Sequence, residues 1–117
     1  MESDFSALAR RLGEVDRLVH EPARLLLLTI LYAVESADFL YLQRQSNLTK
    51  GNLSAHLSRL EEAGYITITK TYRGKIPMTL CQMTEIGRQA FEGYHQHLRE
   101  LLKETNLPSS SKNGEQP

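Results

Sequence analysis

The chain has 117 residues with 14 basic and 14 acidic side chains, so its formal net charge is zero. This length fits one domain and excludes a second catalytic domain, while the balanced charge alone gives no support for a nucleic-acid partner. Cys81, the single cysteine, cannot form an internal disulfide, which fits a reducing compartment. Residues 1–4 lack the features of a secretion signal, and the longest apolar run, at residues 25–34, is too short to cross a bilayer. We expect a single cytoplasmic domain with no membrane partner.

Helical periodicity predicts three helices in the first third of the chain. Apolar residues recur at steps of three and four over residues 4–19, which predicts a helix with one apolar stripe. The stripe consists of Phe5, Leu8, Leu12, Val15 and Val19. Pro22 suits the first turn of a second helix over residues 22–35, which is apolar on most sides and is therefore expected to be central. Ser36 is a candidate cap for a short third helix over residues 37–44.

A fourth helix is expected after a short polar turn at residues 45–48. Thr49 is its candidate N-cap, because a threonine hydroxyl can accept a hydrogen bond from a backbone N–H in the first turn. Three leucines at spacings of four and three form a narrow stripe that we expect to be buried. They are Leu53, Leu57 and Leu60. Gly64, after Ala63, suits the left-handed position at which helices commonly end.

A β-hairpin is expected next. Isoleucine and threonine alternate over residues 65–69, and this period of two in β-branched residues indicates a strand. A turn containing glycine, at residues 72–75, leads to a return strand over residues 76–83. Pro77 places part of that strand at an edge or an irregular start, because proline has no N–H to donate to a neighbour.

Thr84 is the candidate cap of a last helix that runs to about residue 105, and residues 106–117 have the composition of a disordered tail. The apolar side of this helix contains Ile86, Ala90, Phe91, Tyr94, Leu98, Leu101 and Leu102. The order of elements predicts an α+β, mostly helical fold in a single domain over residues 1–105. It is a helix-turn-helix at about 37–63 with a wing at about 65–83, flanked by helices at about 4–19 and 84–105.

Positive charge is concentrated on the expected helix-turn-helix and hairpin. Residues 43–75 hold six basic and two acidic side chains, a net charge of +4 in a neutral chain. The outward half of the fourth helix is small and polar, which lets a helix enter a DNA major groove closely. Arg73 and Lys75 surround the glycine turn, where an arginine can enter a minor groove. A plain surface helix and a solvated turn are the alternatives for each feature alone; the local charge favours DNA.

Three segments resemble winged-helix repressors of the MarR and ArsR type. Residues 48–66 resemble their recognition helix and its exit into the wing. Residues 83–88, which read MTEIGR, resemble the L-T-x-x-G-R motif that opens their last helix. Residues 20–25 resemble the start of the second helix in a small MarR-like family of bacteria and archaea. The resemblance covers about residues 15–103.

The resemblance implies a homodimer in which the first and last helices pack across a two-fold axis. It also implies that six residues of the fourth helix and its cap approach DNA: Thr49, Lys50, Asn52, Ser54, Ala55 and Arg59. The chain differs from many relatives at Ala55, where they carry a larger polar or basic residue, and this argues against a strong base contact there. Residues 41–47 contain no cysteine, so the metal sensing of one ArsR branch is not carried over.

We therefore predict a transcriptional regulator of the prokaryotic cytoplasm, a repressor rather than an enzyme, that binds an inverted repeat of double-stranded DNA as a homodimer. The predicted DNA contacts are Thr49, Lys50, Asn52, Ser54, Ala55, Arg59, Lys70, Arg73 and Lys75. The predicted dimer contacts are Phe5, Leu8, Leu12, Val15, Tyr94, Leu98, Leu101 and Leu102. The alternative is a winged helix that binds another protein instead of DNA.

Other candidate ligand sites find little support. His95 and His97 would lie about 200° apart on a helix and cannot share one metal ion, and no motif for a cofactor is present. His56 is expected to pack at the edge of the core. Cys81 alternates with core-facing positions and is either a redox sensor or, as we favour, an inert thiol. A small-molecule effector could bind between the dimerisation helices and the winged core, but no cluster of polar groups identifies it.

Overall fold

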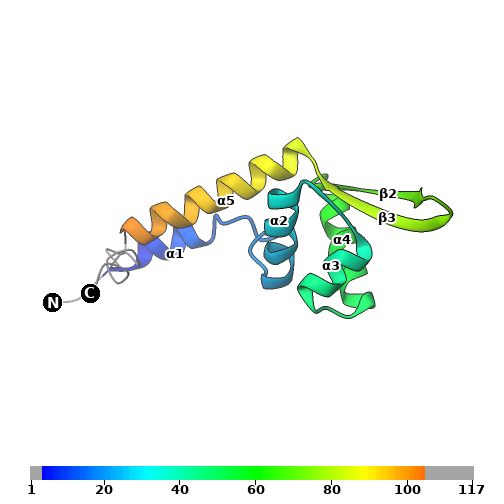
Figure 1. Cartoon of the computed structure of the whole chain (residues 1–117). Coiled ribbons are helices and arrows are strands. Elements are labelled where there is room, and N and C mark those ends of the chain that lie inside the picture. The colour runs from blue at the N-terminus through cyan, green and yellow to red at the C-terminus, as the bar shows by residue number, and fades with distance from the viewer. Residues whose placement is uncertain (1–3, 105–117) are drawn as a thin grey trace, which may run out of the picture.

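The computed structural model describes residues 4–104, which form five helices and a three-stranded sheet. Figure 1 shows two parts, which we call the winged lobe (residues 22–83) and the arm, formed by α1 (Ser6–Leu12) and α5 (Glu85–Glu104). The order of elements confirms the α+β winged-helix prediction. Two predictions lie outside the described residues: that the last helix extends to residue 105, and that residues 106–117 form a tail.

The three helices of the winged lobe each begin at a side-chain cap. The helices are α2 (Pro22–Val34), α3 (Phe39–Ser46) and α4 (Lys50–Glu62). Their caps are Glu21, Asp38 and Thr49, each of which accepts a hydrogen bond from a backbone N–H three residues further on. The caps satisfy N–H groups that have no partner inside the helix, so they fix where each helix starts. The Thr49 cap was predicted from sequence and is confirmed.

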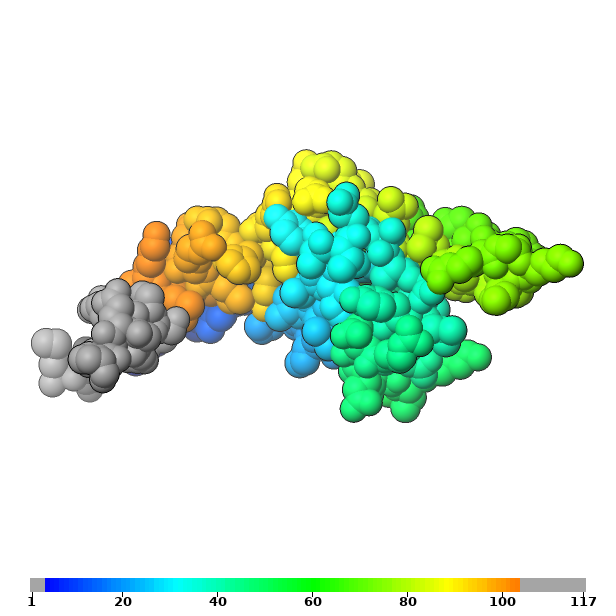
Figure 2. All heavy atoms as spheres, viewed as in Figure 1, coloured from blue at the N-terminus to red at the C-terminus, as the bar shows by residue number. Residues whose placement is uncertain are grey.

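The sheet is antiparallel, with strand order β1-β3-β2. Strand β2 (Ile66–Arg73) pairs with β3 (Ile76–Met83) along its whole length, from Ile66 opposite Met83 to Arg73 opposite Ile76. Strand β1 (Ser36–Asp38) covers only the base of β3, from Leu80 to Gln82. The outer part of the hairpin is therefore two-stranded, and Pro77 lies on a free edge as predicted. This free part is the wing, which projects beyond the body of the lobe in Figure 2.

The core lies between α2, α3, α4 and the base of the sheet. Its fully buried side chains include Leu27, Leu28, Leu31, Leu42, Leu53, Leu57, Leu60, Ile66 and Cys81. The predictions that α2 is central and that α4 buries three leucines are confirmed. Gly64 follows α4 with a φ of +80°, the left-handed conformation predicted for it.

Two predictions about the first third of the chain are wrong. The first helix ends at Leu12, so the helix predicted over residues 4–19 is correct only for its first half, and turns lead from Gly13 to α2. Val15 and Val19 are buried nonetheless, because the turns place their side chains in the core. A strand replaces the start of the predicted third helix, since residues 36–38 pair with β3 and Asp38, rather than Ser36, caps α3.

The arm packs against the lobe along α2. Contacts link α5 to both α1 and α2, so the long helix bridges the two parts of the molecule. Unlike the helices of the lobe, α1 has no buried residue. Within residues 4–104, no helix is both long and apolar enough to cross a membrane.

Candidate nucleic-acid interface

The outward face of α4 carries the residues predicted to approach DNA. Thr49, Lys50, Asn52, Ser54, Ala55 and Arg59 are all exposed, while the leucine stripe on the opposite side is buried. The Thr49 hydroxyl is already engaged as the helix cap, 3.1 Å from the N–H of Asn52. Its role is therefore to order the first turn of α4. The structure leaves the other five residues exposed around the side of α4 that faces away from the leucine stripe.

A buried arginine holds α4 against α2. The Arg24 side chain is 8% exposed, and its guanidinium donates from Nε to the carbonyl of Leu18 at 2.7 Å and from Nη1 to Nδ1 of His56 at 3.2 Å. Because a guanidinium can only donate, Nδ1 of His56 is the acceptor of this bond. His56 is partly buried, which confirms its predicted place at the edge of the core. Arg24 was missed from sequence, although a lone charge inside an apolar helix was the available signal.

The register of the hairpin separates the three wing cations. Side chains alternate between the faces of a strand, so Lys70 and Tyr72 continue the face on which Ile66 packs into the core. Lys70 lies opposite Thr79, and Tyr72 opposite Pro77, on the same face of the wing. Arg73 belongs to the other face, and Lys75 lies in the turn before β3. The inward face of the hairpin thus changes from apolar at its base to polar toward its tip.

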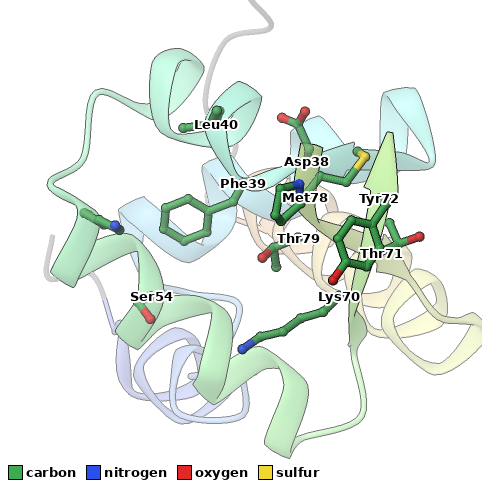
Figure 3. Close-up of a pocket in the computed structure, with 11 residues that line it drawn as sticks. Asp38, Phe39, Leu40, Ser54, Lys70, Thr71, Tyr72, Met78 and Thr79 are labelled. Carbon is green, nitrogen blue, oxygen red and sulfur yellow. The ribbon is translucent and has the colours of Figure 1, made fainter. Parts of the chain in front are cut away.

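A groove of about 710 Å³ lies between α4, the start of α3 and the wing. It is lined by Asp38, Phe39, Leu40, Lys50, Ser54, Lys70, Thr71, Tyr72, Pro77, Met78 and Thr79. In Figure 3 the Lys70 side chain extends from the wing toward α4, which carries Ser54. The groove therefore connects the two surfaces that the sequence assigned separately to DNA binding.

Two cations that line this groove, Lys50 and Lys70, and two at the tip of the wing, Arg73 and Lys75, are available to bind an anion. Lys50, Lys70, Arg73 and Lys75 are exposed, and within residues 4–104 none of these four forms an ion pair with a carboxylate. Unpaired cations can neutralise phosphate groups and release the counterions condensed on DNA. Asp38, the acidic residue of the lining, is engaged through its carboxylate as the cap of α3.

The apolar residues predicted to form a dimer fall into two groups. Phe5 and Leu12 are 61% and 48% exposed, and Leu102 is also exposed. Val15, Tyr94 and Leu101 are buried by the chain itself, while Leu8 and Leu98 are partly buried. Most of the residues predicted to contact a second copy therefore pack within one chain. The exposed apolar surface that remains lies mainly on α1 and on Phe5, which precedes it.

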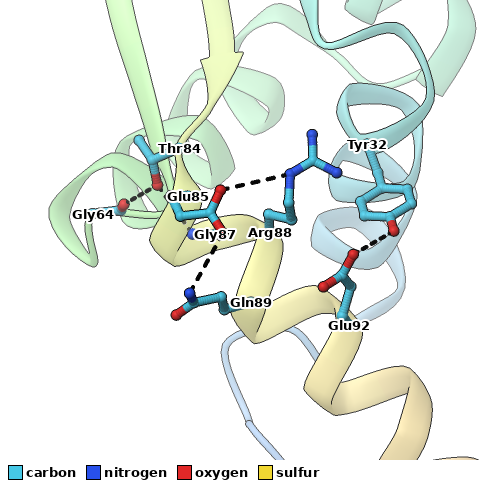
Figure 4. Close-up of polar contacts among 8 residues, drawn as sticks. All are labelled: Tyr32, Gly64, Thr84, Glu85, Gly87, Arg88, Gln89 and Glu92. Carbon is cyan, nitrogen blue, oxygen red and sulfur yellow. Dashed lines mark hydrogen bonds and ion pairs between the residues drawn. The ribbon is translucent and has the colours of Figure 1, made fainter.

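A second groove, of about 680 Å³, lies between α2 and α5, where the sequence left room for an effector. Its lining includes the aromatic rings of Tyr32 and Phe91, whose centroids are 4.9 Å apart, and the polar side chains of His95 and Arg99. The Tyr32 hydroxyl donates to Glu92 at 2.6 Å, and this hydrogen bond raises the pKa of Tyr32. Figure 4 shows this contact at the junction of arm and lobe.

The remaining titratable candidates make separate contacts. His95 pairs with Arg99, whereas His97 donates to the carbonyl of Arg11 at 2.9 Å. No group of three potential metal ligands occurs among residues 4–104. Cys81 itself faces the core, although the sequence placed it in alternation with core-facing positions; burial raises the pKa of its thiol to about 11, with smaller contributions from Glu61 and Asp38. A thiol with a pKa this high is a poor nucleophile at neutral pH.

A helix-turn-helix followed by a two-stranded wing, with exposed cations on both, defines a winged-helix protein. The family of winged helix DNA-binding domains matches residues 23–102, and the chain belongs to this family. The protein MJ0432 of Methanocaldococcus jannaschii is 35% identical over 88 residues, which are 74% of this chain and 95% of the relative.

Solved structures show the same fold. A transcriptional regulator homologue from Pyrococcus horikoshii superposes with a TM-score of 0.78 at 25% identity, over 84% of this chain and 99% of the other. The regulator PcaV of Streptomyces coelicolor, solved with its natural ligand, superposes with a TM-score of 0.64 at 17% identity, over 97% and 89%. The family match and these superpositions confirm the predicted winged-helix fold. Family and fold together point to DNA-binding regulation.

Proposed function

We propose that the chain is a sequence-specific transcriptional repressor of the prokaryotic cytoplasm that binds an inverted repeat of double-stranded DNA as a homodimer. The observation that carries this proposal is the groove between α4 and the wing. The groove joins the polar surface of the recognition helix, including Ser54, to the unpaired cations Lys50 and Lys70. Such a surface suits a DNA backbone that runs between a major groove filled by α4 and the neighbouring minor groove.

In this proposal some residues of α4 contact phosphate groups and others contact bases. Lys50, in the first turn, neutralises a phosphate close to the helix N-terminus, whose N–H groups also favour anions. Asn52 and Ser54 reach base edges, and Ala55 contacts a thymine methyl group or leaves room for close approach. Arg59 lies further along the exposed side and contacts the flanking backbone. The wing residues Lys70, Arg73 and Lys75 add contacts that do not depend on sequence.

The homodimer is supported by the exposed apolar side chains of the arm. Phe5 and Leu12 leave an apolar surface on α1 that a second copy would cover. Two recognition helices presented by a dimer would read half-sites about one helical turn, roughly 34–36 Å, apart.

Salt dependence tests the DNA-binding surface. We expect Arg73→Ala with Lys75→Ala to weaken binding to all sequences and to lower the slope of log affinity against log salt by about 4, because each protomer of the dimer loses two phosphate contacts and each lost contact removes about one unit. Fluorescence anisotropy with a labelled operator measures both quantities. Arg17→Ala with Lys103→Ala is the matched control, since it removes the same charge from exposed positions outside the interface.

The outcomes separate the proposal from its alternative. An equal loss of slope in the two double variants would show that net charge, and not the wing, causes the effect. If the wild type showed no salt-dependent binding even at low ionic strength, a winged helix that binds a protein would be favoured. Selection from random DNA tests readout separately: Asn52→Ala should change the selected motif, and an unchanged motif would contradict base contact by Asn52.

A small-molecule effector is the second partner that we propose. The groove between α2 and α5 supports it, because aromatic and aliphatic walls meet polar side chains such as Arg99 there. PcaV was solved with its natural ligand, and another structural relative, NadR, with 4-hydroxyphenylacetate. A screen of small aromatic acids by thermal shift should find compounds that stabilise the wild type but not a Leu98→Trp variant with a filled groove. Equal shifts in both proteins would argue against this site.

A further inference from the structure

We infer that Tyr65 is a positioning residue that fixes the direction of the α5 arm relative to the recognition helix and thereby sets the half-site spacing that the dimer accepts. The inference rests on the proposed DNA-binding homodimer. Tyr65 lies between Gly64, which ends α4, and Ile66, which begins β2. Its N–H donates to the carbonyl of Leu60 at 3.0 Å, so its backbone is tied to the last turn of the recognition helix.

The first turn of α5 rests directly on the Tyr65 peptide. The Tyr65 carbonyl accepts the N–H of Thr84 at 3.0 Å, and the Thr84 hydroxyl donates to the carbonyl of Gly64. The same hydroxyl accepts the N–H of Gly87 at 3.0 Å and so caps α5, as Figure 4 shows. A Cβ atom on Gly87 would lie 2.0 Å from the Tyr65 carbonyl oxygen. Only glycine allows this approach, so the start of α5 and the end of α4 are in close backbone contact.

The Tyr65 side chain reaches the turns that connect α1 to α2. Its hydroxyl donates to Oδ2 of Asp16 at 2.7 Å, while Oδ1 of Asp16 accepts the N–H groups of Leu18 and Val19. Asp16 therefore organises the turns that connect α1 to α2. Burial and the bond to Asp16 raise the pKa of Tyr65 to about 12, which shows that the neutral hydroxyl is favoured in this contact. Tyr65 thus contacts the start of α5 through its backbone and the turns that follow α1 through its side chain, in addition to the packing of α5 on α2.

We call the contact between Tyr65 and the first turn of α5 the corner. A small change in the angle at the corner has a large effect on the position of the far end of the arm. The 20 residues of α5 span about 30 Å at about 1.5 Å per residue. A rotation of about 10° at the corner would move the far end by roughly 5 Å, more than the rise of about 3.4 Å per base pair. In a dimer joined through the arms, the corner angle therefore sets the distance between the two recognition helices to within a base pair.

Binding to operators with altered spacing tests the inference. The two half-sites are moved apart or together in steps of one base pair, and affinity is measured for the wild type, Tyr65→Phe and Gly87→Ala. Tyr65→Phe keeps the ring but loses the bond to Asp16. We expect it to reduce the discrimination between optimal and shifted spacings by about fivefold, the fold-change equivalent to one hydrogen bond. Gly87→Ala should displace α5 and move the optimum by at least one base pair. Tyr41→Phe, in α3, is the matched control and should keep the wild-type profile.

Affinity for a DNA fragment with a single half-site, measured in parallel, separates positioning from damage to the recognition helix. A broader spacing profile with unchanged half-site affinity supports the role of Tyr65. If Tyr65→Phe keeps the wild-type optimum and width, the inference is overturned while the DNA-binding function stands. A wild type without any preferred spacing would instead overturn the proposed dimeric function, and the inference with it. Tyr65→Phe decides the matter even if Gly87→Ala does not fold.

Discussion

One helix of the winged lobe, α4, and one of the arm, α1, differ in how completely the chain covers their apolar side chains. In the lobe, α4 buries Leu53, Leu57 and Leu60 while its outer face is small and polar. In the arm, α1 buries no residue, and Phe5 and Leu12 remain about half exposed or more. The leucine stripe of α4 thus lies within the core of the lobe, whereas α1 leaves apolar surface of the kind that partners commonly cover. In the proposed function, the outer face of α4 contacts DNA and the exposed face of α1 associates with a second copy.

Truncation of one leucine in each part should give the largest difference in the free energy of unfolding. Leu53→Ala removes a fully buried side chain, so we expect the free energy of unfolding to fall by about 3 kcal/mol. Leu12→Ala removes a half-exposed side chain and should cost less than about 1 kcal/mol. Urea unfolding followed by circular dichroism, at one fixed protein concentration, measures both. Similar costs for the two variants would show that the arm is as well packed as the lobe.

Arg24 should have the second largest effect, because it is the buried charge that joins α2 to the recognition helix. Arg24→Met keeps the aliphatic stem but leaves the Leu18 carbonyl and His56 without their donor. We expect the free energy of unfolding to fall by about 2 kcal/mol, the usual contribution of hydrogen bonds from a charged group. Arg17→Met, at an exposed position, is the control. An equal, small cost in both variants would mean that Arg24 adds nothing to the packing of α4.

The sequence was most informative where local chemistry decides the structure. Thr49 and Gly64 mark the two ends of α4 by rules that involve only a few neighbouring residues, and both predictions are confirmed. The alternation after Gly64 likewise located β2. The exposed positions of the predicted DNA contacts followed from the buried leucine stripe alone. Whether these residues read bases stays a prediction, since exposure does not identify a ligand.

The incorrect predictions concern segments whose structure depends on contacts with distant parts of the chain. Val15 and Val19 continue the helical period of α1, but Asp16 binds the N–H groups of Leu18 and Val19, which stabilises turns in place of a helix. Strand β1 has three residues and exists only because β3, more than forty residues later, pairs with it. The contact of Gly87 with Tyr65 is equally non-local. Periodicity carries no information about such pairings.

The thiol of Cys81 should make the stability of the lobe sensitive to alkaline pH. Because burial raises its folded-state pKa from 9.0 to about 11, the neutral thiol contributes stability that is complete below about pH 9 and is lost as pH rises through about 11. Urea midpoints of the wild type and Cys81→Ala, compared between pH 8 and pH 11, isolate this effect because Tyr65 titrates in both. Parallel pH profiles would contradict a buried, neutral thiol and favour the redox-sensor interpretation.

The smallest effect is expected for a single hydrogen bond between α5 and the turn that precedes α2. The Tyr94 hydroxyl lies 2.7 Å from Nδ1 of His20, and Tyr94→Phe removes this bond while keeping the buried ring. Because His20 is exposed, water can replace the lost partner, so we expect a cost of about 0.5 kcal/mol and a fall in Tm of about 2–4 °C. Thermal unfolding with Tyr41→Phe as control measures it. A fall as large as that of Arg24→Met would mean that the junction is as tightly coupled as the core, and the arm could then not respond to a partner independently of the lobe.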